Sequence, residues 1–189
     1  VYYMDSTLGV NPFTLRDGVL EIAARPASAT GTRLQQGLTH TSELITTKET
    51  FSQLYGYFEM RAELPAVRGF WSAFWMTPVD LSWPPEIDVV EMLGHEPTRI
   101  YTSVHTQADG THRTIGQGVA VEDTSAGFHT FAVSWRPDEI RWYFDGREVF
   151  RAPTPADLHK PMYLLANLSV GGPGSWPGLT SSPGSGCGG

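Results

Sequence analysis

Short runs of β-branched and aromatic residues recur along the whole chain, and no stretch keeps a helical period for long. The 20 glycines and 14 prolines punctuate these runs, and Asp17-Gly18, Asp109-Gly110 and Asp145-Gly146 are strong turn signals. We expect at most one short helical turn, at 154–159. Strands are expected at 19–24, 42–47, 54–64, 71–76, 86–92, 99–106, 129–135, 139–144 and 161–170. This pattern predicts an all-β antiparallel sandwich or barrel.

One expected strand, "EIDVVEM" at 86–92, carries three carboxylates within six residues. Alternate side chains of a strand share a face, so Glu86 and Asp88 lie together. In a regular strand Glu91 would point into the core. Burying an unpaired charge there costs roughly several kcal/mol or forces the carboxyl to protonate. A bulge at Val89-Val90 would insert one extra residue and return Glu91 to the face of the other two acids.

Three acids on one strand face suit the hydrolysis of a glycosidic bond with retention. That reaction needs a carboxylate nucleophile and a second carboxyl that acts first as acid and then as base. A third acid between them, Asp88, can hydrogen-bond the nucleophile. Carboxyls this close cannot all ionise at neutral pH, so at least one pKa should rise. A solvated acidic strand and a calcium-binding edge remain alternatives, because this pattern also occurs by chance.

A neighbouring strand is apolar on both faces. In "FWSAFWM", Trp71 and Trp75 share one face, opposite Phe70, Phe74 and Met76. One face can belong to the core, whereas the other needs a cover, and a sugar ring can supply it. Core packing is the alternative for both tryptophans.

Composition narrows the class of protein. The 189 residues suffice for one domain with a sizeable core, and the formal charge of −7 predicts no nucleic-acid partner. No apolar run approaches the roughly 20 residues of a membrane helix, so no membrane partner is expected. The single cysteine, Cys187, excludes an intrachain disulfide. We expect one domain at 1–172, followed by a flexible Gly/Pro/Ser-rich tail at 173–189.

The chain resembles glycoside hydrolase family 16, the β-jelly-roll endo-glucanases. The segments "YGYFEMRAELP", "GFWSAFWMTP", "EIDVVEM", "FHTFAVSWRPDEIRWYFDG" and "PMYLLANLSVGG", followed by "WPG", occur in the family's order and spacing. The resemblance implies a jelly-roll sandwich of the concanavalin A type with a concave substrate cleft. It also implies Glu86 as nucleophile, Asp88 as its assistant and Glu91 as acid/base, in the bulged form that is typical of the laminarinase-like branch.

The same resemblance implies further site residues. His105 resembles the family's histidine beside the acids, although a lone strand histidine is more often structural. Trp71 and Trp75 resemble the tryptophans that floor the cleft, and Trp176 resembles the tryptophan of the family's "GG-x-WPG" loop. Asn11 and Arg61 resemble residues of the family that make polar contacts to the sugar on the non-reducing side. Surface hydrogen bonding is the alternative for both.

Several properties of the family carry over as expectations. They are catalysis without a cofactor, a polysaccharide substrate, a monomeric state and a secreted or extracellular location. A structural calcium site is left open, because the family's strands before the position of Val1 and at the end of the chain, which carry part of that site, have no counterpart here. We expect no signal peptide within this sequence, and its start at Val1 suggests a processed or trimmed chain.

The closest resemblance is to bacterial glycanases that act on acidic exopolysaccharides of the succinoglycan type. We therefore predict a retaining endo-β-glycanase that cuts internal β-1,3 or mixed β-1,3-1,4-glucosyl linkages. A non-hydrolytic β-glucan-binding module and a transglycosylase on the same fold are the alternatives. The intact Glu86, Asp88 and Glu91 argue against the first, and the sequence does not separate the second.

Overall fold

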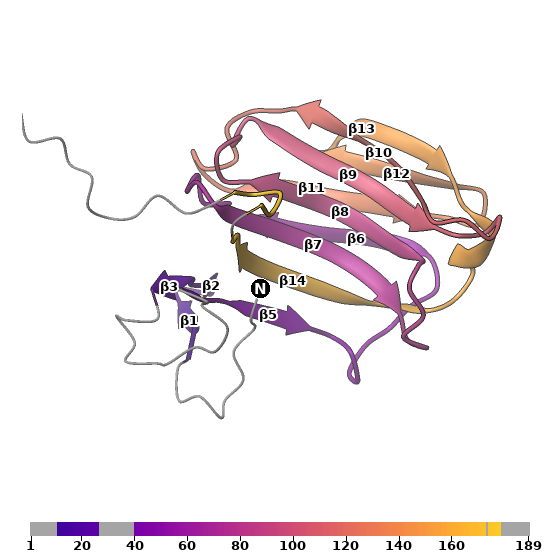
Figure 1. Cartoon of the computed structure of the whole chain (residues 1–189), viewed down its shortest axis with the longest axis horizontal. Helices are drawn as coiled ribbons and strands as arrows, with labels where there is room; N and C mark the ends of the chain where they lie inside the picture. The colour runs from indigo at the N-terminus through magenta and orange to yellow at the C-terminus, as the bar shows by residue number, and fades with distance from the viewer. Residues whose placement is uncertain (1–10, 27–39, 173, 179–189) are drawn as a thin grey trace, which may run out of the picture.

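The computed structural model describes residues 11–26, 40–172 and 174–178, and apart from one short 3₁₀ helix the regular secondary structure of this part is β-strand (Figure 1). Two antiparallel sheets form the body of the molecule. The larger sheet has the order β10 (Arg113–Ala120), β9 (Arg99–Thr106), β8 (Glu86–Leu93), β7 (Phe70–Pro78), β14 (Met162–Val170) and β5 (Glu43–Thr46). The smaller sheet has the order β13 (Arg147–Pro153), β12 (Glu139–Phe144), β11 (His129–Trp135) and β6 (Gly56–Ala62).

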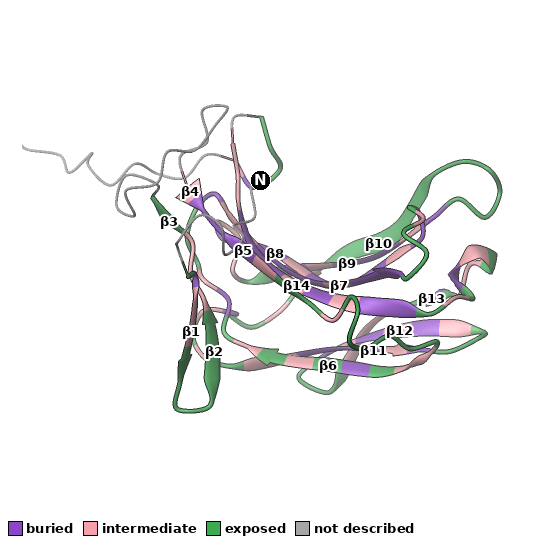
Figure 2. Ribbon diagram, turned by 90° about the horizontal axis from the view of Figure 1, so that it is seen from below, coloured by how far each residue is buried: buried purple, intermediate pink, exposed green. Residues whose placement is uncertain are grey.

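The two sheets stack as the layers of a sandwich, which confirms the predicted jelly-roll class (Figure 2). The six-stranded sheet is curved, and its concave face points away from the four-stranded sheet. The hairpin of β1 (Phe13–Arg16) with β2 (Val19–Ile22) forms a separate two-stranded sheet, and so does the antiparallel pair β3 (Arg25–Pro26) and β4 (His40–Thr41). No helix among the described residues is long and apolar enough to cross a membrane.

The core lies between the two large sheets, and strand parity explains its composition. Phe131, Val133 and Trp135 alternate along β11 and are fully buried, as are Ile140 and Trp142 on β12. The six-stranded sheet supplies Phe74, Met76, Ile87, Met92 and Val104 to the same cluster. The other face of the six-stranded sheet is therefore free to hold polar side chains.

All nine expected strands are present within a few residues of their predicted bounds, and the expected helical turn is a 3₁₀ helix at Ala156–Leu158. Strands β1, β3, β4, β10 and β13 were not predicted. Strand β10 contains two glycines, yet Gly116 suits its place because a Cβ there would clash with Ser103 on the neighbouring strand. The expected turns at Asp17-Gly18 and Asp145-Gly146 have positive φ at both residues, as tight hairpins require.

The expected tail is described only in part. Residues 174–178 are described, and Trp176 lies with its ring edge-on against Trp71, at a centroid distance of 5.6 Å. Residues 173 and 179–189 lie outside the described part of the chain, so the extent of the tail stays a prediction.

Candidate active site

The predicted bulge is present in the acid strand. On one side, Ala73 of β7 pairs with Glu91 and Trp75 pairs with Asp88, so the register shifts by one residue between them. On the other side, Ser103 of β9 pairs with Asp88 and Tyr101 pairs with Glu91, so two residues of β8 stand opposite one. These two residues are Val89 and Val90, and both are buried in the core.

The bulge resolves the parity conflict of the acid strand. Paired residues of antiparallel strands point to the same face, so Glu91 joins Asp88 on the concave side of the sheet. Asp88 is buried, whereas Glu86 and Glu91 are half-buried. From the core side, the indole N–H of Trp142 donates to the backbone carbonyl of Asp88 at 2.8 Å. A core side chain thereby satisfies a backbone acceptor next to the bulge.

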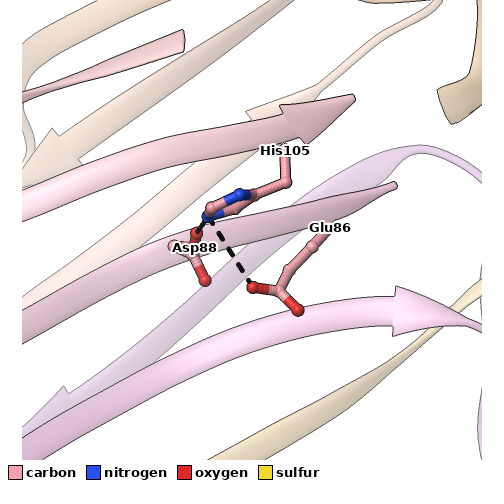
Figure 3. A group of neighbouring side chains, drawn as sticks. All are labelled: Glu86, Asp88 and His105. Atoms are coloured by element: carbon pink, nitrogen blue, oxygen red, sulfur yellow. Dashed lines mark ion pairs between the residues drawn. The ribbon is translucent and has the colours of Figure 1, made fainter. Parts of the chain in front are cut away.

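Asp88 is the most constrained of the three acids. The hydroxyl of Ser103 donates to its Oδ2 at 2.5 Å, and His105 Nε2 lies 3.3 Å from the same oxygen. Figure 3 shows the side chains of Glu86, Asp88 and His105 pointing toward one another from two adjacent strands. These contacts fix Asp88 between the outer acids and connect it to an imidazole.

Glu86 has partners that favour its charged form. His105 Nε2 lies 3.9 Å from its Oε1, and the indole N–H of Trp83 donates to its Oε2 at 3.0 Å. Burial and the nearby charge of Asp88 nevertheless raise the pKa of Glu86 to about 8. Glu86 is therefore a carboxyl whose ionisation depends on its neighbours.

Glu91 faces more negative charge than Glu86 does. Burial raises its pKa to about 8, and the charges of both Asp88 and Glu86 add to this rise. The indole N–H of Trp71 donates to its Oε1 at 3.1 Å and opposes the shift. The pKa of Glu91 is thus shifted in the direction that a general acid needs.

His105 is held at both ring nitrogens. Its hydrogen bond to Asp88 raises the pKa of the imidazole, which favours a cation beside the acids. On the other side of the ring, Nδ1 lies 3.0 Å from His112 Nε2 and 3.2 Å from Thr114 Oγ1. His112 and Trp83 were both missed in the sequence. The hairpin pairing of β9 with β10 folds His112 back over His105, and this pairing could not be inferred while β10 went unrecognised.

The three expected cleft tryptophans differ in how they meet the site. Trp71 bonds Glu91, and Trp176 packs edge-on against both Trp71 and Tyr101. Trp75 is half-buried and donates its indole N–H to Asn167 Oδ1 at 2.8 Å. None of the three belongs to the buried cluster between the sheets. They therefore lie where a sugar ring could contact them.

Two expected sugar contacts are not brought to the acids. Arg61 lies on β6 in the four-stranded sheet, where parity points it outward, and its guanidinium lies 4.3 Å from the centre of the Phe128 ring. Asn11 precedes the separate β1–β2 hairpin, and its side chain accepts the backbone N–H of Phe13. The sequence motif thus predicted the strand of Arg61 correctly. It did not show that this strand belongs to the four-stranded sheet, which does not carry the acids.

Among the described residues, one group of side chains is close enough together to hold a metal ion. It consists of Glu86, Asp88 and His105, with one donor atom from each lying within 4.8 Å of the others. Two of its members, Glu86 and Asp88, belong to the acid set expected for glycosidic chemistry, so their proximity is no separate sign of a metal. The calcium site left open by the sequence concerns the two ends of the chain, where residues 1–10 and 179–189 are not described.

Replacing Trp71 with alanine should reduce turnover far more than stability. The change removes an indole donor to Glu91 and a sugar-stacking surface, so we expect kcat/KM to fall about 10- to 100-fold. The free energy of unfolding should drop by only about 1–2 kcal/mol, because the ring lies outside the main core. Trp135→Ala, in the core, is the matched control and should cost about 3–5 kcal/mol. A large loss of melting temperature in Trp71→Ala with unchanged activity would place Trp71 in the core instead.

Comparisons with known proteins agree on one family. The family model described as "Glycosyl hydrolases family 16" matches residues 8–184. The endo-1,3-1,4-beta-glycanase ExsH of Rhizobium meliloti (strain 1021) is 49% identical over 168 residues, which cover 89% of this chain and 36% of that protein. The beta-glucanase of Rhodothermus marinus is 36% identical over 183 residues, covering 85% of this chain and 60% of that protein. The chain thus spans about a third of ExsH.

A solved structure extends the likeness to three dimensions. The laminarinase catalytic domain from Thermotoga maritima MSB8 superposes with a TM-score of 0.82 at 30% identity. The match covers 96% of this chain and 75% of that one.

Proposed function

The chain belongs to family 16 of the glycosyl hydrolases, and from this premise we propose that it is a retaining endo-β-glycanase. Its proposed reaction is hydrolysis of internal β-1,3 or mixed β-1,3-1,4-glucosyl linkages of a polysaccharide. The observation that carries the proposal is the bulge, which places Glu86, Asp88 and Glu91 on the concave face of the six-stranded sheet. The names of the relatives, endo-1,3-1,4-beta-glycanase, beta-glucanase and laminarinase, support this class of substrate.

The proposed reaction has two displacements. In the first, the carboxylate of Glu86 attacks the anomeric carbon while protonated Glu91 donates its proton to the departing glycosidic oxygen. The bond between the anomeric carbon and that oxygen breaks, and a covalent glycosyl ester forms on Glu86. In the second, Glu91 accepts a proton from water, the water oxygen attacks the anomeric carbon, and Glu86 leaves as a carboxylate.

The contacts of the acids support this division of roles. Glu86 accepts the indole N–H of Trp83 and lies near His105, and both contacts lower its pKa against the larger opposing effects of burial and Asp88. Glu91 faces the charges of both other acids and is expected to retain its proton. Asp88, held by Ser103 and His105, is placed to orient Glu86.

The stereochemistry of the product tests this mechanism. Two displacements keep the configuration of the cleaved bond, so a β-glucan should first release a β-anomer. Proton NMR on fresh digests of laminarin and lichenan can detect the first anomer before mutarotation. If the α-anomer forms first, the displacement is single and Glu86 is not the nucleophile. If no reducing ends appear from laminarin, lichenan or succinoglycan, the chain is a binding module rather than a hydrolase.

We infer three further properties from the family alone. The protein should need no cofactor for catalysis, act as a monomer and meet its polysaccharide outside the cell. Retained activity after treatment with a chelator, measured together with the melting temperature, would separate a metal-free reaction from a structural calcium.

A further inference from the structure

A second feature of the cleft face lies three strands away from the acid strand. A hollow of about 360 Å³ is lined by residues 48–52, between β5 and β6, together with Val79 and Tyr163. We propose that this hollow is a distal subsite that binds a glucosyl ring of the same polysaccharide chain. This inference rests on the proposed function and extends it to the length of substrate that the enzyme grips.

The register of the sheet connects the hollow to the acids. His105 pairs with Glu86 across β9 and β8, and Met76 pairs with Ile87 across β7 and β8. The next position in that register sets Thr77 of β7 opposite Glu86, and Thr77 in turn pairs with Tyr163 of β14. Directly paired residues share a face, so Tyr163 lies on the concave face in the row of Glu86.

The length of this row fits a chain of sugars. Neighbouring strands are about 4.8 Å apart, so the β5 edge lies roughly 14 Å from β8. A pyranose ring is about as wide as one strand spacing, ~5 Å. The hollow would therefore hold a ring about three residues away from the reacting one. Trp75 and Asn167, which are hydrogen-bonded to each other, lie on the same face, on the two strands between the acids and the hollow.

The lining of the hollow has the two kinds of surface that a sugar needs. Phe51 is 46% exposed and Val79 is 45% exposed, so the hollow offers apolar surface that a ligand can reach. An aromatic face can pack on the C–H face of a pyranose. Lys48 and Glu49, for which no ion pair is found in the described part of the chain, can bond its hydroxyls.

The loop that carries Phe51 is held in place before any ligand arrives. The hydroxyl of Thr47 donates to the carbonyl of Phe51 at 2.8 Å and accepts the backbone N–H of Leu164 at 3.0 Å. The hydroxyl of Thr50 donates to the carbonyl of Thr47 at 3.1 Å. A loop fixed to β14 in this way loses little conformational freedom when it binds.

The test compares Phe51→Ala with the unmodified protein on β-1,3 and mixed-linkage oligosaccharides of increasing length. For chains long enough to reach the hollow we expect kcat/KM to fall about tenfold, and for the shortest cleaved chains it should not change. Phe128→Ala is the matched control, because Phe128 is also exposed, at 40%, but contacts Arg61 on the four-stranded sheet. An equal loss at every length, or no loss at any length, would overturn the proposal.

A binding measurement keeps this test independent of hydrolysis. Long and short oligosaccharides are titrated into the Glu86→Gln variant and into the double variant that also carries Phe51→Ala. The second substitution should weaken the affinity for the long oligosaccharide about tenfold and leave the affinity for the short one unchanged. Equal affinity with and without Phe51 would overturn the subsite. The two proposals can also fail separately. If Phe51 strengthens binding of long chains but the unmodified protein releases no reducing ends, the subsite is supported and the proposed hydrolysis is rejected.

Discussion

Glu86→Gln should lower kcat on laminarin or lichenan by at least about 10⁴-fold, because the amide cannot form the glycosyl ester on which the first displacement depends. Burst measurements on an activated aryl glycoside should detect no covalent intermediate in this variant. The substitution keeps the size of the side chain, so the cleft and its substrate affinity should survive. Activity within tenfold of the unmodified protein would remove Glu86 from the nucleophile's role.

Stability provides the internal control for that variant. Glu86 has a folded-state pKa of about 8, above its ordinary value of 4.5, so the folded protein holds a proton that the unfolded chain has lost. Its contribution to stability is therefore present below about pH 4.5 and is lost as the pH rises toward 8. Glutamine does not titrate, so Glu86→Gln should melt at the same temperature as the parent or higher at pH 8. A lower melting temperature there would mean that the lost activity reflects a damaged fold.

Glu91→Ala should lower kcat by about 10³-fold on a polysaccharide, because neither the departing oxygen nor the attacking water has its proton-transfer partner. On a nitrophenyl glycoside the first step needs little acid help, so the covalent intermediate should accumulate. Azide should then restore turnover, since this small anion attacks the intermediate without a general base. The product should be a β-glycosyl azide.

The configuration of that azide distinguishes the two outer acids. An α-azide from Glu91→Ala would result from a single displacement and would make Glu91 the nucleophile. Asp145→Ala is a suitable control, because Asp145 is a carboxylate in the β12–β13 turn that pairs with His129, outside the acid cluster. Azide should have no effect on its activity.

Strand parity is the reason why so much of the candidate site could be predicted. The conflict at Glu91 required either a buried charge or an extra residue, and the register shows that the extra residue is there. The edge strands gave weaker signals. Strand β10 is mostly exposed and contains glycines at 116 and 118, so neither alternation nor β-propensity marks it. His112 was missed for this reason.

Contacts between layers were beyond the reach of the sequence. Arg61 alternates correctly along β6, but only the pairing of β6 with β11 shows that the strand belongs to the sheet without the acids. Trp83 lies before the acid strand, and its bond to Glu86 depends on how the loop folds back. Such placements are set by tertiary packing, which short-range patterns do not encode.

The hydrogen bond from the core residue Trp142 to the carbonyl of Asp88 ties the acid strand to the opposite sheet. Trp142 is fully buried on β12, so its indole cannot move without disturbing the packing between the layers. The acids are thus set in place from behind, on strands rather than on a closing lid. The free-energy cost of bringing the like charges of the acids together is met once, when the chain folds. Little reorganisation of the acids should therefore be needed as each substrate reacts.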